Sequence, residues 1–514
     1  MNTARLRQIA NWLIHFPLHP FILAIYPILG LLAVNLTEVN GREVTEPLQV
    51  ALAAVVIIFI VTRLISRNWQ LAGLLTSLFL VWFYAYGHIY NQVKNFNVFG
   101  IVVGRHRYLI ILWSAIILAV AIWMIKKHRS FPSLTLYLNI VFLILVAIPG
   151  VQIGAFYIQN NSNTKTQAAE PQPPLISWTS STTLPDIYYI ILDGYGRADA
   201  LQQVERIDNS AFINRLQQLG FYVAECSHSN YTRTALSLTS TFNMEYLQTL
   251  NPQVDPGAST AWLLPYLKHN LVRQQLEQLG YQTIVFKNPW ETLVWDDANI
   301  VYKSSVSGVL SPFEYLLLST TVTWVYLDGQ QVASTQLAYH SNYQDTLYAL
   351  DKLQDVPKIP GPKFVFAHLV IPHSPYVFGP DGEYIDIRPY DTINNLYTDE
   401  DHRRGYTSAL TYINKRMLEI LPKLIQSSKT KPIIIVAGDH GTGEFATVTW
   451  NLEAFYTPDS QPLFYEDISP VNIFRVLFDA YYNGKFDLLP DKSYISTGGQ
   501  YFNFQEIPNP CTSR

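Results

Sequence analysis

Five uncharged stretches dominate the first third of this chain of 514 residues, at 8–37, 47–62, 68–93, 108–125 and 130–164. A helix needs about 20 apolar residues to cross the core of a bilayer, where unpaired backbone groups are not tolerated. We therefore predict five transmembrane helices within residues 1–158, with Arg63 snorkelling to lengthen the short second one. A cleaved signal peptide fits poorly, because three prolines interrupt the first stretch and no small-residue cleavage site follows it.

Charge divides the chain at the same place. Residues 1–158 hold eleven Lys or Arg and three Glu, a net charge of +8, whereas the remainder holds 24 basic and 36 acidic residues. An acidic domain does not attract a polyanion, so the sequence argues against a nucleic-acid partner.

The positive residues between the predicted helices indicate their orientation. With the N-terminus in the cytoplasm, the loops on that side hold seven Lys or Arg and the opposite loops hold four, three of them within 91–107. Five crossings then place the C-terminal domain on the other side. We predict a multi-pass protein of the inner (cell) membrane with a cytoplasmic N-terminus and a periplasmic or extracellular C-terminal domain.

A polar stretch separates the membrane part from the rest. Residues 159–184 are rich in Ser, Thr and Pro and are typical of a flexible linker, which leaves 185–514 as the extracytoplasmic domain. Cys226 and Cys511 do not form a disulfide framework. In an oxidising compartment they could pair and hold the C-terminal tail, but the sequence leaves that open.

The C-terminal domain alternates short apolar runs with helical patterns. Two helices, spanning about 212–219 and 271–279, end at Gly220 and Gly280, the residue type preferred just past a helix. Ser469 and Pro470 begin another helix, which extends to Phe478. Strands are predicted at 187–192, 221–225, 281–286, 363–371 and 432–438. This alternation predicts a mostly parallel sheet covered by helices on both faces.

Polar residues follow several of these strands, at the edge where such sheets place their chemistry. Asp193 follows the first strand, and Asp439 and His440 follow the last. Singly, Asp193 is typical of a turn, and a Ser or Thr before a helix is typical of an N-cap. Together, two carboxylates and an imidazole form a ligand set suited to Zn²⁺ or Mn²⁺. A hydroxyl at a helix N-terminus beside that ion would lose its proton more readily.

Four motifs follow one another along the C-terminal domain: strand–Asp193-Gly, then NYTRTALSLTS, then IPHSPY, then AGDHG. In this order they resemble the motifs of the alkaline phosphatase/sulfatase superfamily. With the five-helix membrane part, the chain is most similar to the membrane-anchored branch, which includes lipoteichoic acid synthases and lipid A phosphoethanolamine transferases. The resemblance covers about residues 185–485 and implies an alkaline phosphatase-like fold.

The resemblance implies roles for particular residues. The nucleophile of those transferases falls on Thr234, with Thr232 as the competitor and Ser229 more remote. The metal ligands fall on Asp193, Thr234, Asp439 and His440, where the first is often Glu in the family. His373, in IPHSPY, matches a position near the phosphate or leaving group, although a solvent-exposed turn histidine is the alternative.

Two further histidines are predicted to be structural. We interpret His368 as a core histidine within its strand and His402 as a surface residue. Cys226 lacks the sequence that surrounds the modified cysteine of soluble sulfatases, and no second set of ligands is evident between 375 and 438. One divalent ion, Zn²⁺ or Mn²⁺, is therefore expected.

We predict a membrane-anchored transferase that moves a phosphoryl-linked headgroup, such as phosphoethanolamine or phosphoglycerol, through a phospho-threonine intermediate. A membrane lipid is the expected donor, and an envelope glycan or lipid alcohol the expected acceptor. Two alternatives stay open: a phosphodiesterase or sulfatase-like hydrolase that releases its product to water, and a non-catalytic binding module on a membrane anchor.

Overall fold

The computed structural model describes residues 16–36, 44–94, 96–98, 101–102, 104–127, 132–167, 173–179, 183–288, 295–304, 312–329, 331–385, 399–443, 445–459 and 463–511. The chain divides into two compact units. The helical unit joins Met1–Gln159 to Val309–Ala338, and the sheet unit joins Asn160–Gly308 to Tyr339–Arg514. The chain therefore passes between the units three times.

The helical unit contains the apolar helices predicted from the sequence. They are α2 (His19–Val34), α3 (Thr45–Ser66), α4 (Trp69–Val93), α5 (His106–Lys126) and α6 (Pro132–Gln167), with α13 (Pro312–Ser319) and α14 (Trp324–Gly329). Among the described residues, α3 to α6 are long and apolar enough to cross a membrane, whereas α2 has 16 residues and is shorter. Helix α6 continues to Gln167, into the stretch predicted to be a linker. A small hairpin, β1 (Asn97–Val98) and β2 (Ile101–Val102), precedes α5.

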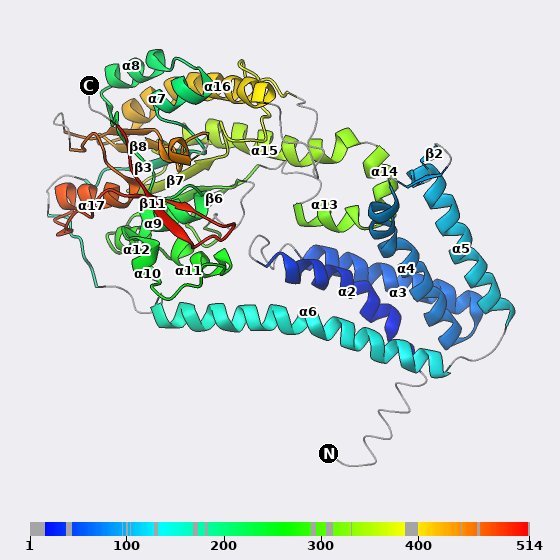
Figure 1. Cartoon of the computed structure of the whole chain (residues 1–514). Coiled ribbons are helices and arrows are strands. Elements are labelled where there is room, and N and C mark those ends of the chain that lie inside the picture. The colour runs from blue at the N-terminus through cyan, green and yellow to red at the C-terminus, as the bar shows by residue number, and fades with distance from the viewer. Residues whose placement is uncertain are drawn as a thin grey trace. The chain divides into compact units, whose positions relative to one another are not determined.

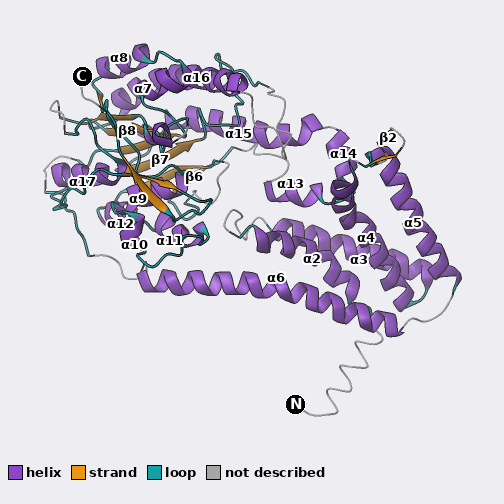
Figure 2. Cartoon of the chain, viewed as in Figure 1, coloured by secondary structure: helices purple, strands orange, loops and turns teal. Residues whose placement is uncertain are grey.

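A seven-stranded sheet forms the centre of the sheet unit, and Figure 2 shows its strands between helices. The strand order is β4-β9-β8-β3-β7-β5-β6. The bounds are β3 (Ile187–Leu192), β4 (Tyr222–Val223), β5 (Gln282–Phe286), β6 (Ile300–Tyr302), β7 (Lys363–Leu369), β8 (Ile433–Ala437) and β9 (Glu453–Tyr456). All five predicted strands are present, and β6 and β9 are additions.

The sheet is mixed, although most of it is parallel. Strands β8, β3, β7, β5 and β6 pair in parallel, as predicted. Strand β9 pairs antiparallel with β8, and β4 pairs antiparallel with β9. The predicted strand 221–225 is reduced to two residues at this edge.

Helices cover both faces of the sheet, as predicted for strands that are apolar on both sides (Figure 1). In β3, Ile187, Tyr189 and Ile191 face one layer, and the alternate residues face the other. One layer contains α9 (Thr234–Asn243), α12 (Leu271–Gln278) and α17 (Pro470–Tyr481); the other contains α8 (Ser210–Gln218), α15 (Gln331–Leu353) and α16 (Asp399–Ser427). The shorter elements are α7 (Ala198–Ala200), a π-helical turn (Leu201–Glu205), α10 (Leu247–Leu250), α11 (Leu263–Lys268), and the hairpin of β10 (Ser493–Ser496) and β11 (Phe504–Ile507).

The central strand β3 has β8 on one side and β7 on the other, all parallel. Their carboxyl ends therefore lie side by side at one edge of the sheet. This strand order brings together residues that are up to 247 positions apart in the sequence, from Asp193 to His440.

Candidate metal centre

Two buried aspartates lie at this edge of the sheet. Asp193 directly follows β3, and Asp439 follows β8 by one glycine. Ile191 of β3 is paired in register with Ala437 of β8, so the two aspartates leave neighbouring strands at the same level. Each is 1% exposed. The predicted convergence of Asp193 with Asp439 is therefore present in the structure.

Two carboxylate oxygens in this cluster are buried without a hydrogen-bond partner, Asp193 Oδ1 and Asp439 Oδ2. His440 Nε2 lies 3.5 Å from the first and 3.7 Å from the second. Zinc bonds of about 2.0–2.2 Å in a tetrahedral site place ligand atoms about 3.3–3.6 Å apart. Because buried carboxylate oxygens normally have partners, these atoms are candidate metal ligands. Ligand atoms lie within 4.8 Å of one another in two sets that share Asp193, one with His373 and His440 and one with His368 and Asp439.

Backbone contacts hold these side chains in place. The Gly194 N–H donates to Asp439 Oδ1 at 3.0 Å, which leaves the other oxygen facing the cluster. Gly194 has a φ of +69°, and a Cβ there would lie 3.3 Å from the His373 ring. Nδ1 of His440 lies 2.8 Å from its own neighbour's carbonyl, Gly441 O. A proton on Nδ1 would satisfy that contact and keep the Nε2 lone pair available for a metal.

His368 is buried within β7, as predicted, but it does more than pack. Its Nε2 lies 3.2 Å from Asp193 Oδ2, and its Nδ1 lies 3.2 Å from the Asn288 amide nitrogen. With Asn288 donating to Nδ1, the Nε2–H donates to the carboxylate. Ligand atoms of His368, Asp193 and Asp439 lie within 4.8 Å of one another. The sequence signal is strand alternation, since His368 shares a face with Phe364 and Phe366, which pack toward α9.

His373 reaches the same cluster from the loop after β7. Its backbone N–H donates to Asp193 O at 3.0 Å, and its ring Nδ1 lies 2.6 Å from Ser374 O. Ligand atoms of His373, Asp193 and His440 lie within 4.8 Å of one another. The ring is half-buried and lies 5.8 Å from that of His440, centroid to centroid. His373 is thus not an isolated turn histidine; it borders the cluster where a substrate could reach it.

The histidines and carboxylates change each other's proton affinity. Burial disfavours the charged form of Asp193, but the surrounding histidines outweigh burial and hold the pKa of this carboxyl below its usual range. Burial likewise opposes protonation of His440, but Asp439 and Asp193 outweigh it and raise the pKa of the imidazole. Asp193 is therefore ionised at neutral pH, so its carboxylate can bind a cation.

Thr234 is the first residue of α9 and is half-buried. The preceding Arg233 is exposed and has extended backbone angles. Ser229, the remote alternative, is fully buried, and its hydroxyl donates to Tyr231 O at 2.9 Å. Thr232, the nearer alternative, is half-buried. Helix position alone gives Thr234 the favourable electrostatic environment of a helix N-terminus.

Two other residues named from the sequence are also placed. The His402 side chain is 41% exposed, and its ring nitrogens lie 3.2 Å from Glu205 Oε1 and 2.8 Å from the Tyr376 hydroxyl. Cys226 and Cys511 form a disulfide, which joins the C-terminal tail to the segment before α9.

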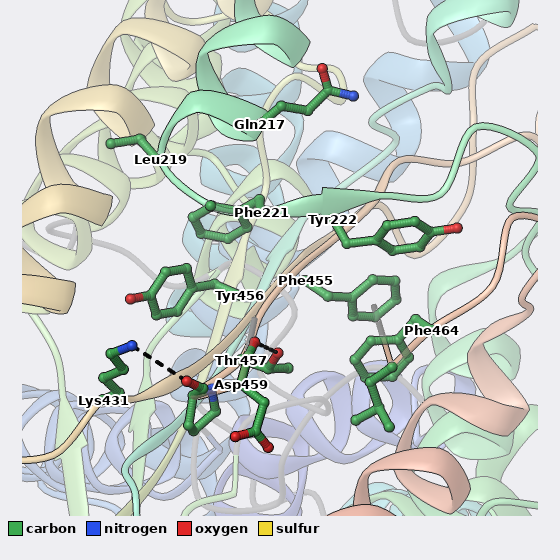
Figure 3. A pocket seen from close by; sticks show the side chains of 13 residues that line it. Gln217, Leu219, Phe221, Tyr222, Lys431, Phe455, Tyr456, Thr457, Asp459 and Phe464 are labelled. Carbon is green, nitrogen blue, oxygen red and sulfur yellow. Dashed lines mark hydrogen bonds between the residues drawn. The ribbon is translucent and has the colours of Figure 1, made fainter. Parts of the chain in front are cut away.

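A separate cavity of about 460 Å³ lies at the opposite end of the same strands (Figure 3). Tyr456, one of its lining residues, is paired in register with Ile434 at the start of β8, whereas Asp439 follows the end of β8. Aromatic rings line it, including Phe455 and Phe464, which stack with centroids 3.8 Å apart. The cavity is therefore not part of the carboxylate–histidine cluster.

The part of the chain that holds the carboxylate–histidine cluster is similar to known proteins. Residues 185–467 match the family described as Sulfatase. The chain is similar to the C-terminal periplasmic domain of EcEptC from Escherichia coli in complex with Zn, at 13% identity over 65% of this chain and 96% of that chain, with a TM-score of 0.44. It is similar to the integral membrane protein lipooligosaccharide phosphoethanolamine transferase A from Neisseria meningitidis, at 13% identity over 90% of this chain and 96% of that chain, with a TM-score of 0.38. It is also similar to a phosphonate monoester hydrolase of Agrobacterium radiobacter, at 13% identity over 61% of this chain and 80% of that chain, with a TM-score of 0.39. No curated protein matches the chain.

Proposed function

Because this chain belongs to the sulfatase family, which matches residues 185–467 and so more than half of its length, we propose that it transfers a phosphoryl-linked headgroup from a membrane lipid to an alcohol. It is an enzyme of the sulfatase/alkaline phosphatase superfamily. The observation that carries the proposal is the pair of unpartnered oxygens, Asp193 Oδ1 and Asp439 Oδ2, facing His440 Nε2.

One divalent ion, Zn²⁺ or Mn²⁺, would be held by Asp193, Asp439 and His440, with the hydroxyl of Thr234 as the fourth ligand. The bound ion would lower the pKa of that hydroxyl and neutralise charge on the transferred phosphoryl group. The fit rests on the chemistry of the donor set and on its distances.

The reaction is proposed to proceed in two displacements. The Thr234 hydroxyl releases its proton to solvent and its oxygen attacks phosphorus, while the bond from phosphorus to the lipid oxygen breaks. The N-terminus of α9 favours the developing negative charge on Thr234. His373, which borders the cluster, protonates the departing lipid oxygen. An acceptor hydroxyl then gives its proton to His373 and its oxygen attacks phosphorus, while the bond from phosphorus to the Thr234 oxygen breaks and Thr234 regains a proton from solvent.

A lipid donor suits the helical unit, whose described residues include four helices long and apolar enough to cross a membrane. We propose a protein of the inner membrane whose catalytic domain, 185–514, lies outside the cytoplasm. The excess of Lys and Arg in the loops on the N-terminal side supports this orientation. The disulfide of Cys226 and Cys511 also supports it, because disulfides persist in oxidising compartments.

Substitution of Thr234 tests the nucleophile, with Thr232 as the matched control. We expect Thr234→Ala to lower turnover by about 10⁴-fold or more while metal stays bound through three remaining ligands. Thr232→Ala should keep turnover. Mass spectrometry of wild-type protein incubated with lipid donor but no acceptor should find the headgroup phosphate on Thr234. Full activity of Thr234→Ala, or modification of Thr232 instead, contradicts the assignment.

Product analysis tests the acceptor. We expect the headgroup to disappear from envelope glycans or lipids, as measured by mass spectrometry, in cells that lack the protein. Purified enzyme with lipid donor should form product only when an acceptor alcohol is present. Release of the headgroup to water at the same rate without an acceptor would identify a hydrolase instead.

A further inference from the structure

Residues 312–329 lie in the catalytic part of the sequence but pack with the helical unit. They form α13 and α14, and the chain reaches them after β6 and leaves them through α15. Val309–Ala338 belongs to the same compact unit as Met1–Gln159. Within 309–338 the only charged residues are Glu314 and Asp328. The segment is therefore apolar enough to lie among the helices.

The turn between α13 and α14 is hydrogen-bonded to the backbone of α4. The Gly87 N–H donates to Thr320 O at 2.9 Å, and Phe83 O accepts from the Val322 N–H at 2.8 Å. In a regular α-helix the Gly87 N–H would donate to the carbonyl of Phe83, four residues earlier. Here the turn provides a partner for each of these two backbone groups, a contact more specific than apolar packing.

The absence of a side chain at Gly87 makes this contact possible. A Cβ at Gly87 would lie 2.3 Å from Ser319 O and 2.6 Å from Thr320 Cα, both backbone atoms. In contrast, a Cβ at Gly30 in α2 would meet no atom within 4 Å. These two glycines therefore form a matched pair for testing the contact.

Apolar side chains of α13 extend the interface. Phe313 is fully buried and Leu317 is 8% exposed, in one cluster with Ile28, Leu32 and Val44. Ile28 and Leu32 belong to the last part of α2, and Val44 directly precedes α3. The segment therefore packs with α2 as well as with α4, and Ile153 of α6 packs against the same cluster.

The position of Gly87 fixes how deeply the segment inserts. Gly87 lies six residues before the end of α4 at Val93, which corresponds to about 9 Å along the helix axis. The contact therefore lies near the C-terminal end of α4.

We propose that residues 312–329 are a second attachment of the catalytic domain to the helical unit, formed by docking on α4 and separate from the covalent connection at the end of α6. The catalytic domain is then held at both the start and the middle of its sequence. This attachment restricts how far the active site can move from the helices. It does not depend on which headgroup or acceptor the enzyme uses, so its test is separate from tests of the reaction.

Cleavage of the first connection tests the second. A protease site is inserted between Gln167 and Pro173 of the full chain, which carries an affinity tag at its N-terminus, and the protein is cut in detergent. Both cysteines of the disulfide lie in the C-terminal fragment, so that bond cannot join the fragments. We expect the C-terminal fragment to remain bound to the tagged N-terminal fragment during purification. Its release from the wild-type protein on cleavage would overturn the proposal.

Two variants test whether the turn between α13 and α14 keeps the C-terminal fragment bound. Gly87→Leu should release at least about tenfold more C-terminal fragment than the wild type, whereas Gly30→Leu should behave as the wild type. Val322→Pro removes the N–H that donates to Phe83 O and leaves the sequence of α4 unchanged, so it should also increase release even if Gly87→Leu does not fold. Equal retention in Gly87→Leu, Val322→Pro and the wild type would overturn docking on α4.

Discussion

The two ends of β3 each carry a buried aspartate, and the two are used differently. At the amino end, Asp186 Oδ1 lies 3.0 Å from Lys363 Nζ, which also donates to the carbonyls of Ile359 and Gly361. At the carboxyl end, Asp193 keeps one oxygen without a partner. The same strand therefore has a satisfied polar group at one end and an unsatisfied one at the other, which separates scaffold from active site.

The pKa shifts of the two aspartates have opposite signs. Burial raises the pKa of Asp186, and Lys363 reverses only part of that change. At Asp193 burial has the same effect, but the surrounding histidines outweigh it and lower the pKa. The carboxyl end thus keeps a charged carboxylate at neutral pH with a free oxygen, which is what a cation site requires.

The largest effect is expected from Asp193→Asn. This change removes one charged ligand, so we expect turnover to fall by about 10³-fold or more and the bound metal to fall below one equivalent by elemental analysis. Unchanged turnover with full metal content would mean that Asp193 is not a ligand.

The same substitution at the other end of β3, Asp186→Asn, should lower stability and leave turnover unchanged. Removal of the carboxylate leaves the buried Lys363 ammonium without an opposite charge, although its hydrogen bonds to Ile359 and Gly361 remain, so we expect the free energy of unfolding to fall by up to about 3–5 kcal/mol. Turnover below the melting temperature should stay close to that of the wild type. Asp186→Asn combined with Lys363→Met should recover most of the stability in denaturant unfolding. A loss of turnover without a loss of stability would remove the distinction between the two ends.

A smaller effect is expected from His368→Phe, which removes the donor to Asp193 Oδ2 and keeps an aromatic ring in β7. Without this hydrogen bond the carboxylate is less well oriented, so we expect metal affinity to fall by about 10–100-fold in titrations. Excess metal should restore most of the turnover. His402→Phe, at a half-exposed site that contacts Glu205, should leave metal affinity unchanged.

The sequence predicts those site residues whose position depends on a single strand, and it does not predict contacts that depend on the order of the strands in the sheet. Asp193, Asp439 and His440 each follow an apolar run directly, and carboxyl ends of parallel strands share an edge. The role of His368 depends on β7 lying beside β3, and strand order cannot be read from periodicity. Strand β9 escapes prediction because it is four residues long and contains the buried Glu453. The docking of residues 312–329 depends on Gly87, more than 200 positions earlier.

The smallest effect concerns Glu453, another buried carboxyl group, on the strand next to β8. Asn451 donates to one of its oxygens at 2.9 Å, and the other, Oε2, has no partner. Burial raises the pKa of Glu453 well above its usual value, and that hydrogen bond opposes the rise without reversing it. Unlike Asp193, Glu453 has no compensating cation or histidine within the part of the chain that the structure describes, so it favours the neutral form.

The sign of the pH effect follows from this raised pKa. An acid whose pKa is higher in the folded state stabilises the fold below its unfolded pKa of about 4.5 and loses that contribution as pH rises. Glu453→Gln is neutral throughout, so its free energy of unfolding relative to the wild type should increase between pH 5 and 8, by at most about 1.4 kcal/mol per pH unit. Denaturant unfolding at several pH values measures this difference, with Glu400→Gln on the exposed surface of α16 as the reference. A difference that does not change with pH would show that Glu453 is charged when folded, and the carboxyl groups near β8 would then be alike after all.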